Sequence, residues 1–471
     1  MTVIQDPDPG VVVREGEYGT RVTTIEPGGV EFIPLAERHG RPRQLFWTWT
    51  SPNLEFATIF VGVLSIAAFN LSFWQAALAL ALGSGLGAVT HGLLSAEGPR
   101  HGVPQMVLGR LSFGFLGNAL PAGLNAVVAG IGWFSVNSVS GTLALNTLTG
   151  MPKPLCLLIV VAAMVVIGFF GHNLVQAFEK YAFPLLAVIF AIAAVVILSK
   201  SHPGHAGGPG GGTGGFLLTV GAAFGYAAGW NPYAADYTRY LAPDAGKRAV
   251  GLAAGLGLFL SCTLLEIVGA ASATIGGNAL GDPTGVFTGH LPDLLGKLTL
   301  LAITIGAIAA NALNVYSGSM SFVAMGVKLP LALRRAIVAG AFGGIGLVMA
   351  YFGLEDAGAK YEGFLLVIAY WIGPWLGVVL VDQLLRHGRD TGAQLFDRHY
   401  SNWAGPIAMV AGVVLSVWLF SNQQKYVGLV AKEFPSIGDI AFEIGFVISA
   451  VVYLALRPLL AKPATPDQPN P

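Results

Sequence analysis

Two short stretches that combine tryptophan, asparagine and proline interrupt otherwise apolar segments of this sequence. They are Thr48–Phe56, which reads TWTSPNLEF, and Gly225–Tyr237, which reads GYAAGWNPYAADY. A helix in lipid must satisfy its own backbone hydrogen bonds, so broken backbone at that depth has to be covered by protein or line a watery cavity. A pair of interrupted spans, one in each half of a chain, is typical of a transporter's substrate site.

The first stretch predicts two half-helices. Pro52 has no backbone N–H, and the side chain of Asn53 competes with the helix ladder, so we expect one half-helix to end near Thr50 and another to start near Phe56. The freed carbonyls and amides, with Asn53, would hold a substrate or a cation. Alternatively, Pro52 simply begins a helix, where proline is common. Glu55 is costly in hydrocarbon unless it faces a cavity or a partner, which makes it a candidate for ion coupling.

The second stretch has weak points at Gly225, Gly229 and Pro232. Aromatic faces for stacking on a ligand are offered by Phe224, Tyr226, Trp230 and Tyr233. Asp236 and Arg239 stand three residues apart, hence on one helix face. The pair is interpreted either as an ion pair at a helix end or as a cytoplasmic gate.

Trp133 lies well inside an apolar segment, in the sequence GIGWFSVN (Gly130–Asn137). Glycines beside it, Gly130 among them, would let a ligand approach the backbone while the indole offers a stacking face. The alternative is an anchor at the membrane interface, the usual place for tryptophan in a span.

Asn311 and Asn314 also share a helix face, and their carboxamides match the donors and acceptors of a planar heterocycle. The alternative for the two asparagines is hydrogen bonding between helices, worth roughly 1 kcal/mol.

Few other residues in the apolar segments are ionisable. Glu266 is an intramembrane carboxylate under any placement and a second candidate for coupling, whereas His91 is expected to be a packing residue. The sequence has no GxxxxGK[ST] phosphate loop, and no nucleophile–base arrangement or metal-ligand spacing stands out. Cys156 and Cys262 lie in apolar segments and predict neither a disulfide framework nor a metal cluster. We therefore expect no enzyme activity, no metal and no cofactor.

Composition fixes the class of protein. Of the 471 residues, 54% are hydrophobic and only 11% are charged, against roughly 25% charged in soluble proteins. The polar amino terminus lacks an early apolar stretch, so no cleaved signal peptide is expected. The apolar runs predict an all-α membrane protein with twelve transmembrane helices, at approximately 45–69, 73–95, 115–141, 154–172, 177–199, 214–238, 250–274, 296–325, 331–352, 361–386, 403–420 and 437–457.

The connecting loops predict the orientation. With the amino terminus and the even-numbered connections on one side, that side holds nineteen Lys and Arg residues and the other holds six. This asymmetry predicts a multi-pass protein of the plasma (inner) membrane with both termini cytoplasmic. The expected parts are a cytoplasmic segment (1–44), a five-helix half (45–199), a Gly-rich external loop (200–213), a second five-helix half (214–386), helices 11 and 12 (387–457) and a cytoplasmic tail (458–471).

Four stretches in order carry a family resemblance: GPRHGVPQMVLGRLSFGFLGN (Gly98–Asn118), GIGWFSVNSVSG (Gly130–Gly141), WNPYAADYTRYLAPDAG (Trp230–Gly246) and NALNVYSGSMSFVAMG (Asn311–Gly326). The chain resembles the purine–cytosine permeases of the nucleobase:cation symporter-1 family, and EFIPLAERHGRPRQLFWTWTSPNLEF is similar to the purine–cytosine branch. The resemblance implies a leucine-transporter-like fold, with two inverted five-helix repeats, two extra helices and substrate held between spans 1, 3, 6 and 8.

The resemblance also implies residue roles. Trp133 matches the tryptophan that stacks on the base, Asn311 and Asn314 fall near the asparagines that read its edge, and the span 6 aromatic is one of Phe224, Tyr226 and Trp230. Bacterial cytosine carriers have a glutamine where this chain has Gly130, which argues against cytosine itself.

The coupling ion has two candidates. Sodium-coupled members use span 1 carbonyls and span 8 hydroxyls, for which this chain offers Thr304 and Ser317; proton-coupled members need a carboxylate, for which it offers Glu55 and Glu266. Protons are slightly favoured.

The expected function is import of a nucleobase or related heterocycle by cation symport with alternating access. The alternatives are a carrier for allantoin, hydantoin or a nucleoside, and a channel-like or sensory membrane protein. The expected partners are the small-molecule substrate, the coupling cation (H⁺ or Na⁺) and the lipid bilayer, without nucleic acid; the oligomeric state is left open.

Overall fold

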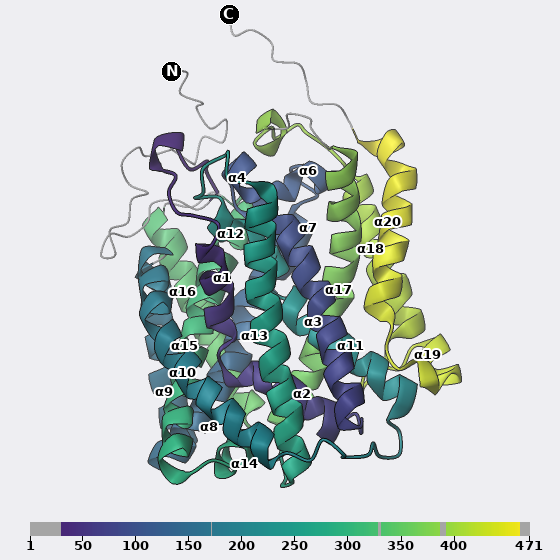
Figure 1. Cartoon of the computed structure of the whole chain (residues 1–471). Helices are drawn as coiled ribbons and strands as arrows, with labels where there is room; N and C mark the ends of the chain where they lie inside the picture. Colours follow the sequence, from purple (N-terminus) through teal and green to yellow (C-terminus); the bar gives the residue numbers. More distant parts are fainter. Residues whose placement is uncertain (1–29, 171, 328–330, 387–391, 462–471) are drawn as a thin grey trace, which may run out of the picture.

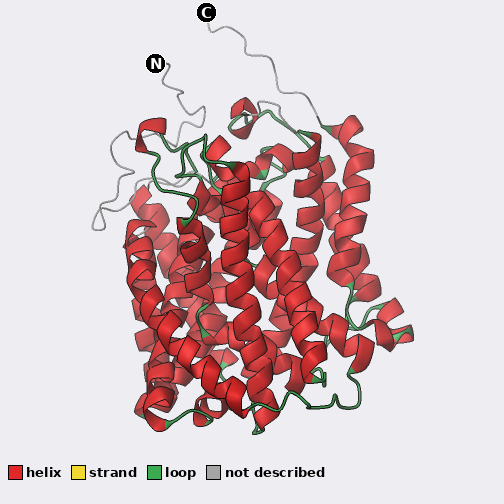
Figure 2. Ribbon diagram, viewed as in Figure 1, coloured by secondary structure: helices red, strands yellow, loops and turns green. Residues whose placement is uncertain are grey.

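The computed structural model describes residues 30–170, 172–327, 331–386 and 392–461. Across these residues it consists of helices joined by loops (Figure 2), which confirms the all-α prediction. Long helices run side by side as one bundle, and the described chain begins and ends at the same end of it (Figure 1). This end is called the terminal end below.

Every predicted span coincides with a helix or with a pair of helices. These are α1 with α2 (Gln44–Thr50, Phe56–Ala67), α3 (Phe73–Ser95), α7 with α8 (Ala119–Val127, Phe134–Thr149), α9 (Lys153–Phe170), α10 (His172–Lys200), α11 with α12 (Gly212–Ala228, Ala234–Thr238), α13 (Lys247–Ile275), α15 (Asp293–Ala324), α16 (Leu331–Gly353), α17 (Ala357–Leu385), α18 (Ala404–Phe420) and α20 (Ala441–Leu460). The connections hold α4 (Gly98–His101), α5 (Gln105–Leu108), α6 (Arg110–Phe113), α14 (Pro283–Gly289) and α19 (Leu429–Glu433).

By length and apolar character, seven helices of the described chain can each cross a membrane. The bent pair α1–α2 adds an eighth. Three further apolar helices, within α9, α16 and α18, are shorter. The structure is therefore that of a multi-pass membrane protein, with enough helix for several crossings.

The break in the first span lies where the sequence predicts it. Helix α1 ends at Thr50, a 3-10 turn covers Ser51–Asn53, and α2 starts at Phe56. The two arms differ in direction by 61°. The backbone of Glu55 is extended, so it separates the arms instead of continuing the helix. The prediction of two half-helices is confirmed.

The second interrupted stretch also breaks. Helix α11 ends at Ala228, a 3-10 turn covers Asn231–Tyr233, and the short α12 follows. Gly225 lets α11 touch α17, because a Cβ there would lie only 2.2 Å from the carbonyl oxygen of Leu365. The part of α11 that leads into the break is therefore held against α17. The break residues Trp230, Asn231 and Tyr233 are buried, as a break within a membrane must be.

Small residues bring α2 and α13 into backbone contact. A Cβ on Gly62 would lie 1.7 Å from the carbonyl oxygen of Glu266, and one on Gly269 would lie 1.8 Å from that of Ile59. Such contacts are how helices associate closely in lipid. They fix the second arm of the broken first span against a long, continuous helix.

Candidate functional site

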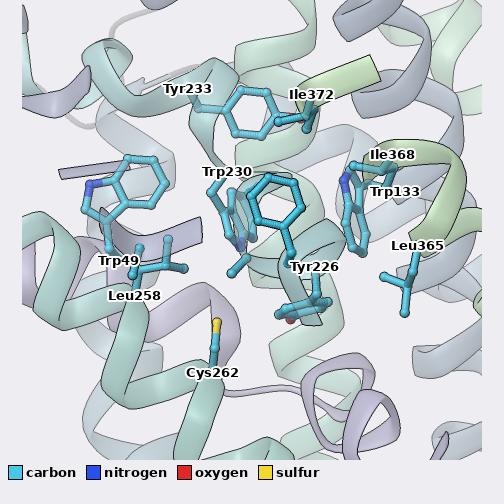
Figure 3. Close-up of a cluster of buried hydrophobic side chains, with 14 of the residues drawn as sticks. Trp49, Trp133, Tyr226, Trp230, Tyr233, Leu258, Cys262, Leu365, Ile368 and Ile372 are labelled. Atoms are coloured by element: carbon cyan, nitrogen blue, oxygen red, sulfur yellow. The ribbon is translucent and has the colours of Figure 1, made fainter. Parts of the chain in front are cut away.

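The two breaks face each other and are joined directly by a hydrogen bond. The indole Nε1 of Trp230 donates to Oδ1 of Asn53 at 2.9 Å, and Nδ2 of Asn53 donates to the carbonyl oxygen of Trp49 at 2.7 Å. Asn53 is fully buried. Figure 3 shows Trp49, Trp133, Tyr226, Trp230 and Tyr233 gathered around the break in the second stretch. The buried carboxamide of Asn53 thus has one partner in its own span and one in the other interrupted span.

A second link between the breaks runs through Tyr226. Its hydroxyl lies 2.5 Å from Oγ1 of Thr58 and donates to Oε1 of Glu55 at 3.3 Å. The Thr58 hydroxyl donates in turn to the carbonyl oxygen of Asn53 at 2.6 Å. Tyr226 therefore connects the carboxylate on the first span to the aromatic side chains of the sixth.

Glu55 is buried, with 1% of its surface exposed, and it caps α2. Its Oε2 accepts the backbone N–H of Ala57 at 2.9 Å. A carboxylate at a helix N-terminus satisfies a free N–H and lies at the positive end of the helix dipole. The break in the first span thus supplies a place where this ionisable group can lie within the membrane.

Trp133 lies at the end of a π-helical segment, Val128–Trp133, between α7 and α8. Its ring meets Tyr226 edge-on at 5.4 Å between centroids and Phe364 of α17 edge-on at 5.1 Å. A Cβ on Gly229 would lie 3.0 Å from the Trp133 ring, so the second break needs glycine there to accept the indole. π-Helical turns are frequent at functional sites. The structure thus brings Trp133 to the break, as expected of a substrate-binding residue.

Asn311 and Asn314 are buried in α15 and belong to a network of carboxamides. Oδ1 of Asn311 accepts from Nδ2 of Asn137 at 3.0 Å and from Nδ2 of Asn314 at 3.1 Å. Nδ2 of Asn311 donates to the carbonyl oxygen of Phe134 at 2.8 Å. The Tyr233 hydroxyl donates to Oδ1 of Asn314 at a long 3.4 Å. Asn311 thus ties α15 to α8, whereas Asn314 is the member that reaches the second break.

Two predicted site residues lie elsewhere. Phe224 stacks on Phe442 of α20, with centroids 4.0 Å apart and an interplanar angle of 12°. A Cβ on Gly130 would lie 2.4 Å from the ring of Phe342 in α16. Tyr226 and Trp230 are therefore the span 6 aromatics that meet the first break, and Phe224 and Gly130 contact neighbouring helices.

The hydroxyls considered for sodium are far apart. Thr304 and Ser317 are thirteen residues apart on the single helix α15, or about 20 Å at 1.5 Å per residue. Thr304 donates to the carbonyl oxygen of Leu300 in its own helix, and Ser317 lies beside Asp236. One ion cannot touch both hydroxyls in this arrangement.

The second buried carboxylate, Glu266 of α13, is hydrogen-bonded to a side chain of α3. The Ser84 hydroxyl donates to Oε2 of Glu266 at 2.7 Å, while Oε1 has no hydrogen-bond partner. Glu266 is fully buried in α13. Its backbone lies against Gly62 of α2, and its side chain is not among those that meet at the two breaks.

Asp236 and Arg239 lie in the part of the sixth span that continues to the terminal end, and both are buried. Oδ1 of Asp236 accepts the backbone N–H of Gln105 at 2.9 Å. Arg239 donates to the hydroxyls of Tyr240 at 3.1 Å and Tyr316 at 3.2 Å. These bonds tie the sixth span to α5 and α15 between the aromatic cluster and the terminal end.

Sequence reasoning did not identify Thr58, Asn137 and Phe364, which contact predicted site residues. It also did not identify Tyr361, whose hydroxyl donates to the carbonyl oxygen of Ala57 at 2.9 Å and whose ring stacks on Phe60. No spacing signal marks these residues, because they come from α2, α8 and α17 and their partners are fixed only by packing. The one available signal was Asn137, which closes the motif that contains Trp133.

The chain is similar to known proteins over most of its length. Residues 32–445 match the family described as permeases for cytosine/purines, uracil, thiamine and allantoin. The chain is 28% identical to purine-cytosine permease fcyB of Emericella nidulans, covering 93% of this chain and 89% of that protein. It is 29% identical to purine-cytosine permease FCY2 of Saccharomyces cerevisiae, covering 88% and 82%.

Among solved structures, the chain is similar to Mhp1, a nucleobase-cation-symport-1 family transporter in a closed conformation with bromovinylhydantoin bound. The TM-score is 0.72 at 19% identity, covering 94% of each chain. An inward-facing conformation of Mhp1 gives a TM-score of 0.71. The fold is therefore that of this transporter.

Proposed function

This chain belongs to the family of permeases for cytosine/purines, uracil, thiamine and allantoin, and on that premise we propose that it imports a nucleobase of the cytosine or purine class by cation symport with alternating access. It is a transporter and not an enzyme. The observation that carries the proposal is the bond between Trp230 and Asn53, because it brings the two interrupted spans together at one buried place.

The proposed substrate site lies between Trp133, Trp230 and the Asn53 carboxamide. Indole rings offer stacking faces to a planar base, and base–aromatic stacking is worth about 1–3 kcal/mol per base. The relatives from Emericella nidulans and Saccharomyces cerevisiae carry purine and cytosine in their names, which supports this class. Asn314 is the proposed reader of the base edge, because its oxygen accepts only a long hydrogen bond from Tyr233.

We propose that the coupling ion is a proton and that Glu55 carries it. Glu55 is bonded to Tyr226 at the site, whereas Glu266 accepts a hydrogen bond from Ser84 of α3. The arrangement of α15 argues against sodium. It meets the break at Gly306, where a Cβ would lie 2.5 Å from the carbonyl oxygen of Leu54, and the flanking residues are isoleucine and alanine. These residues bring no hydroxyl to the span 1 carbonyls.

The proposed topology has twelve crossings, with two inverted five-helix repeats followed by α18 and α20. The likeness to Mhp1 supports the fold, and the charge asymmetry of the loops supports a cytoplasmic location for the terminal end. The proposed membrane is the plasma (inner) membrane. In this topology the bonds of Asp236 and Arg239 lie between the site and the cytoplasm and form the inner gate.

Uptake of labelled bases tests this function. Cells that lack their own base carriers and express the protein are given labelled adenine or cytosine, with unlabelled hypoxanthine, uracil, allantoin, hydantoin and adenosine as competitors. We expect accumulation above the external concentration and competition by nucleobases. Preferential competition by allantoin or hydantoin would move the substrate to those heterocycles. Equilibration without accumulation would contradict symport and favour a channel-like protein.

A further inference from the structure

A cavity of about 210 Å³ lies at the end of the bundle away from the terminal end, between α2, α8, α14, α16 and α17 (Figure 1). Its lining is mostly apolar and includes four aromatic side chains, those of Phe56, Phe60, Tyr361 and Phe364, which form its aromatic wall. Pockets for drug-sized ligands have roughly 300–1,000 Å³, so this one suits only a smaller molecule. A cavity of this size with flat aromatic walls matches a small planar compound.

Two buried hydroxyls in the lining have no hydrogen-bond partner. They are Oγ of Ser140 on α8 and Oγ1 of Thr284 on α14, and the residues are 7% and 0% exposed. A buried polar group without a partner costs about 1–3 kcal/mol. Most buried polar groups in proteins have a hydrogen-bond partner, so two hydroxyls without one indicate a place for a ligand or a bound water.

The other polar side chains that line the cavity are already bonded to protein. The Ser135 hydroxyl donates to the carbonyl oxygens of Ile131 and Gly346, the Tyr361 hydroxyl to that of Ala57, and Nζ of Lys360 to that of Phe352. Among these side chains, Ser140 and Thr284 are therefore the two whose hydroxyls have no hydrogen-bond partner.

The cavity and the candidate substrate site share a wall. Phe364 lines the cavity, and the same ring meets Trp133 edge-on at 5.1 Å. The ring also lies over Gly132, where a Cβ would come within 2.4 Å of it. A molecule in the cavity would thus contact the same ring that contacts Trp133 at the candidate substrate site.

We propose that this cavity is a second binding site, an outer one, for the same planar heterocycle that the protein transports. The ligand would stack on the aromatic wall and bond to the hydroxyls of Ser140 and Thr284 before it passes Phe364. The inference rests on the proposed function for the identity of the ligand. A bound water would satisfy the hydroxyls equally well but would leave the aromatic wall without a role.

The test is chemical protection of Ser140→Cys. Cys156 and Cys262 are both fully buried, so the native chain gives the background for a membrane-impermeant methanethiosulfonate reagent applied from outside. We expect Ser140→Cys to be modified from outside and expect adenine or cytosine to slow the reaction. The concentration that gives half-protection should be unchanged when Trp133→Ala is added, because the outer site does not need that indole.

Two further variants test the hydroxyls. Thr284→Val in the Ser140→Cys background keeps the shape but removes a hydrogen bond, and should raise the half-protecting concentration by roughly three- to tenfold. Ser135→Ala is the matched control from the same wall, and it should leave that concentration unchanged because its hydroxyl is already bonded to carbonyl oxygens.

The possible failures are distinguishable when uptake is measured on the same cells. Absence of modification from outside, absence of protection, or a tenfold shift of protection by Trp133→Ala would overturn the outer site while uptake upholds the function. An unchanged half-protecting concentration in Thr284→Val would point to bound water and also overturn it. Protection without any uptake would uphold the outer site and overturn the proposed function.

Discussion

The indole of Trp230 donates a hydrogen bond of 2.9 Å to the carboxamide of Asn53, which lies 177 positions away in the chain, and both residues are buried. Each residue belongs to the interrupted part of its own span. Their bond joins the two breaks, so a change in the direction of the first span at its break would also displace the sixth span or break the bond. Both residues therefore have a structural role besides any contact with substrate.

Trp230→Phe keeps an aromatic ring and removes the N–H that Asn53 accepts. We expect the initial rate of base uptake, at equal surface expression, to fall roughly tenfold, because a buried acceptor left unpaired costs about 1–3 kcal/mol. The matched control is Trp418→Phe, whose ring is exposed on α18 and which should transport normally. Equal uptake by the two variants would show that the link has no role in transport.

Trp133→Ala should weaken base binding by about tenfold to a hundredfold, the cost of losing one stacking partner at about 1–3 kcal/mol. Trp133→Phe keeps a ring in contact with Tyr226 and Phe364 and should recover most of the affinity. Binding is measured on purified protein after a check that thermal unfolding is unchanged. If a well-folded Trp133→Ala binds as tightly as the native chain, Trp133 is only a packing residue.

The two asparagines of α15 should behave differently. Asn311→Ala leaves Asn137 and the carbonyl oxygen of Phe134 without partners, so we expect a lower midpoint of thermal unfolding and an unchanged order of base preference. Asn314→Ala should change that order, because a site built to hydrogen-bond a ligand penalises a mismatched one. A competition panel on both variants decides. If Asn314→Ala keeps the native order of bases, the pair serves only to join helices.

The sequence was sufficient to predict the positions of the helices and of the first break. Apolar runs have a length that lipid imposes, and a proline beside an asparagine interrupts the helix ladder whatever surrounds it. The half-helices were expected to end near Thr50 and to start near Phe56, and α1 ends and α2 starts at these residues. The role of Trp133 was implied by the family resemblance, and its binding of substrate stays a prediction.

The direction in which each side chain points could not be predicted in the same way. Phe224 and Tyr226 are two residues apart on α11, yet one stacks on Phe442 and the other meets Trp133. Which face of a helix meets which neighbour depends on packing between helices distant in sequence. The π-helical segment before Trp133 adds a local rotation that regular helical spacing does not predict. Gly130, which was expected to let a ligand approach the backbone beside Trp133, faces Phe342 of α16.

Coupling of base uptake to protons through Glu55 is tested most directly by Glu55→Gln. The amide keeps the shape of the side chain but cannot change charge as the carrier cycles. Its carbonyl oxygen can still accept the N–H of Ala57 that caps α2. We therefore expect the variant to exchange labelled base across the membrane but not to accumulate it. Glu433→Gln, exposed on α19, is the matched control and should accumulate base normally.

The decisive measurement is base accumulation in sodium-free proteoliposomes under an imposed pH gradient, acidic outside. If Glu55 couples uptake to protons, the native protein concentrates the base above its external level, while Glu55→Gln brings it only to equilibrium. Accumulation that needs sodium and is independent of the pH gradient would contradict proton coupling. That result would instead indicate a sodium site at the carbonyl oxygens freed by the break in the first span.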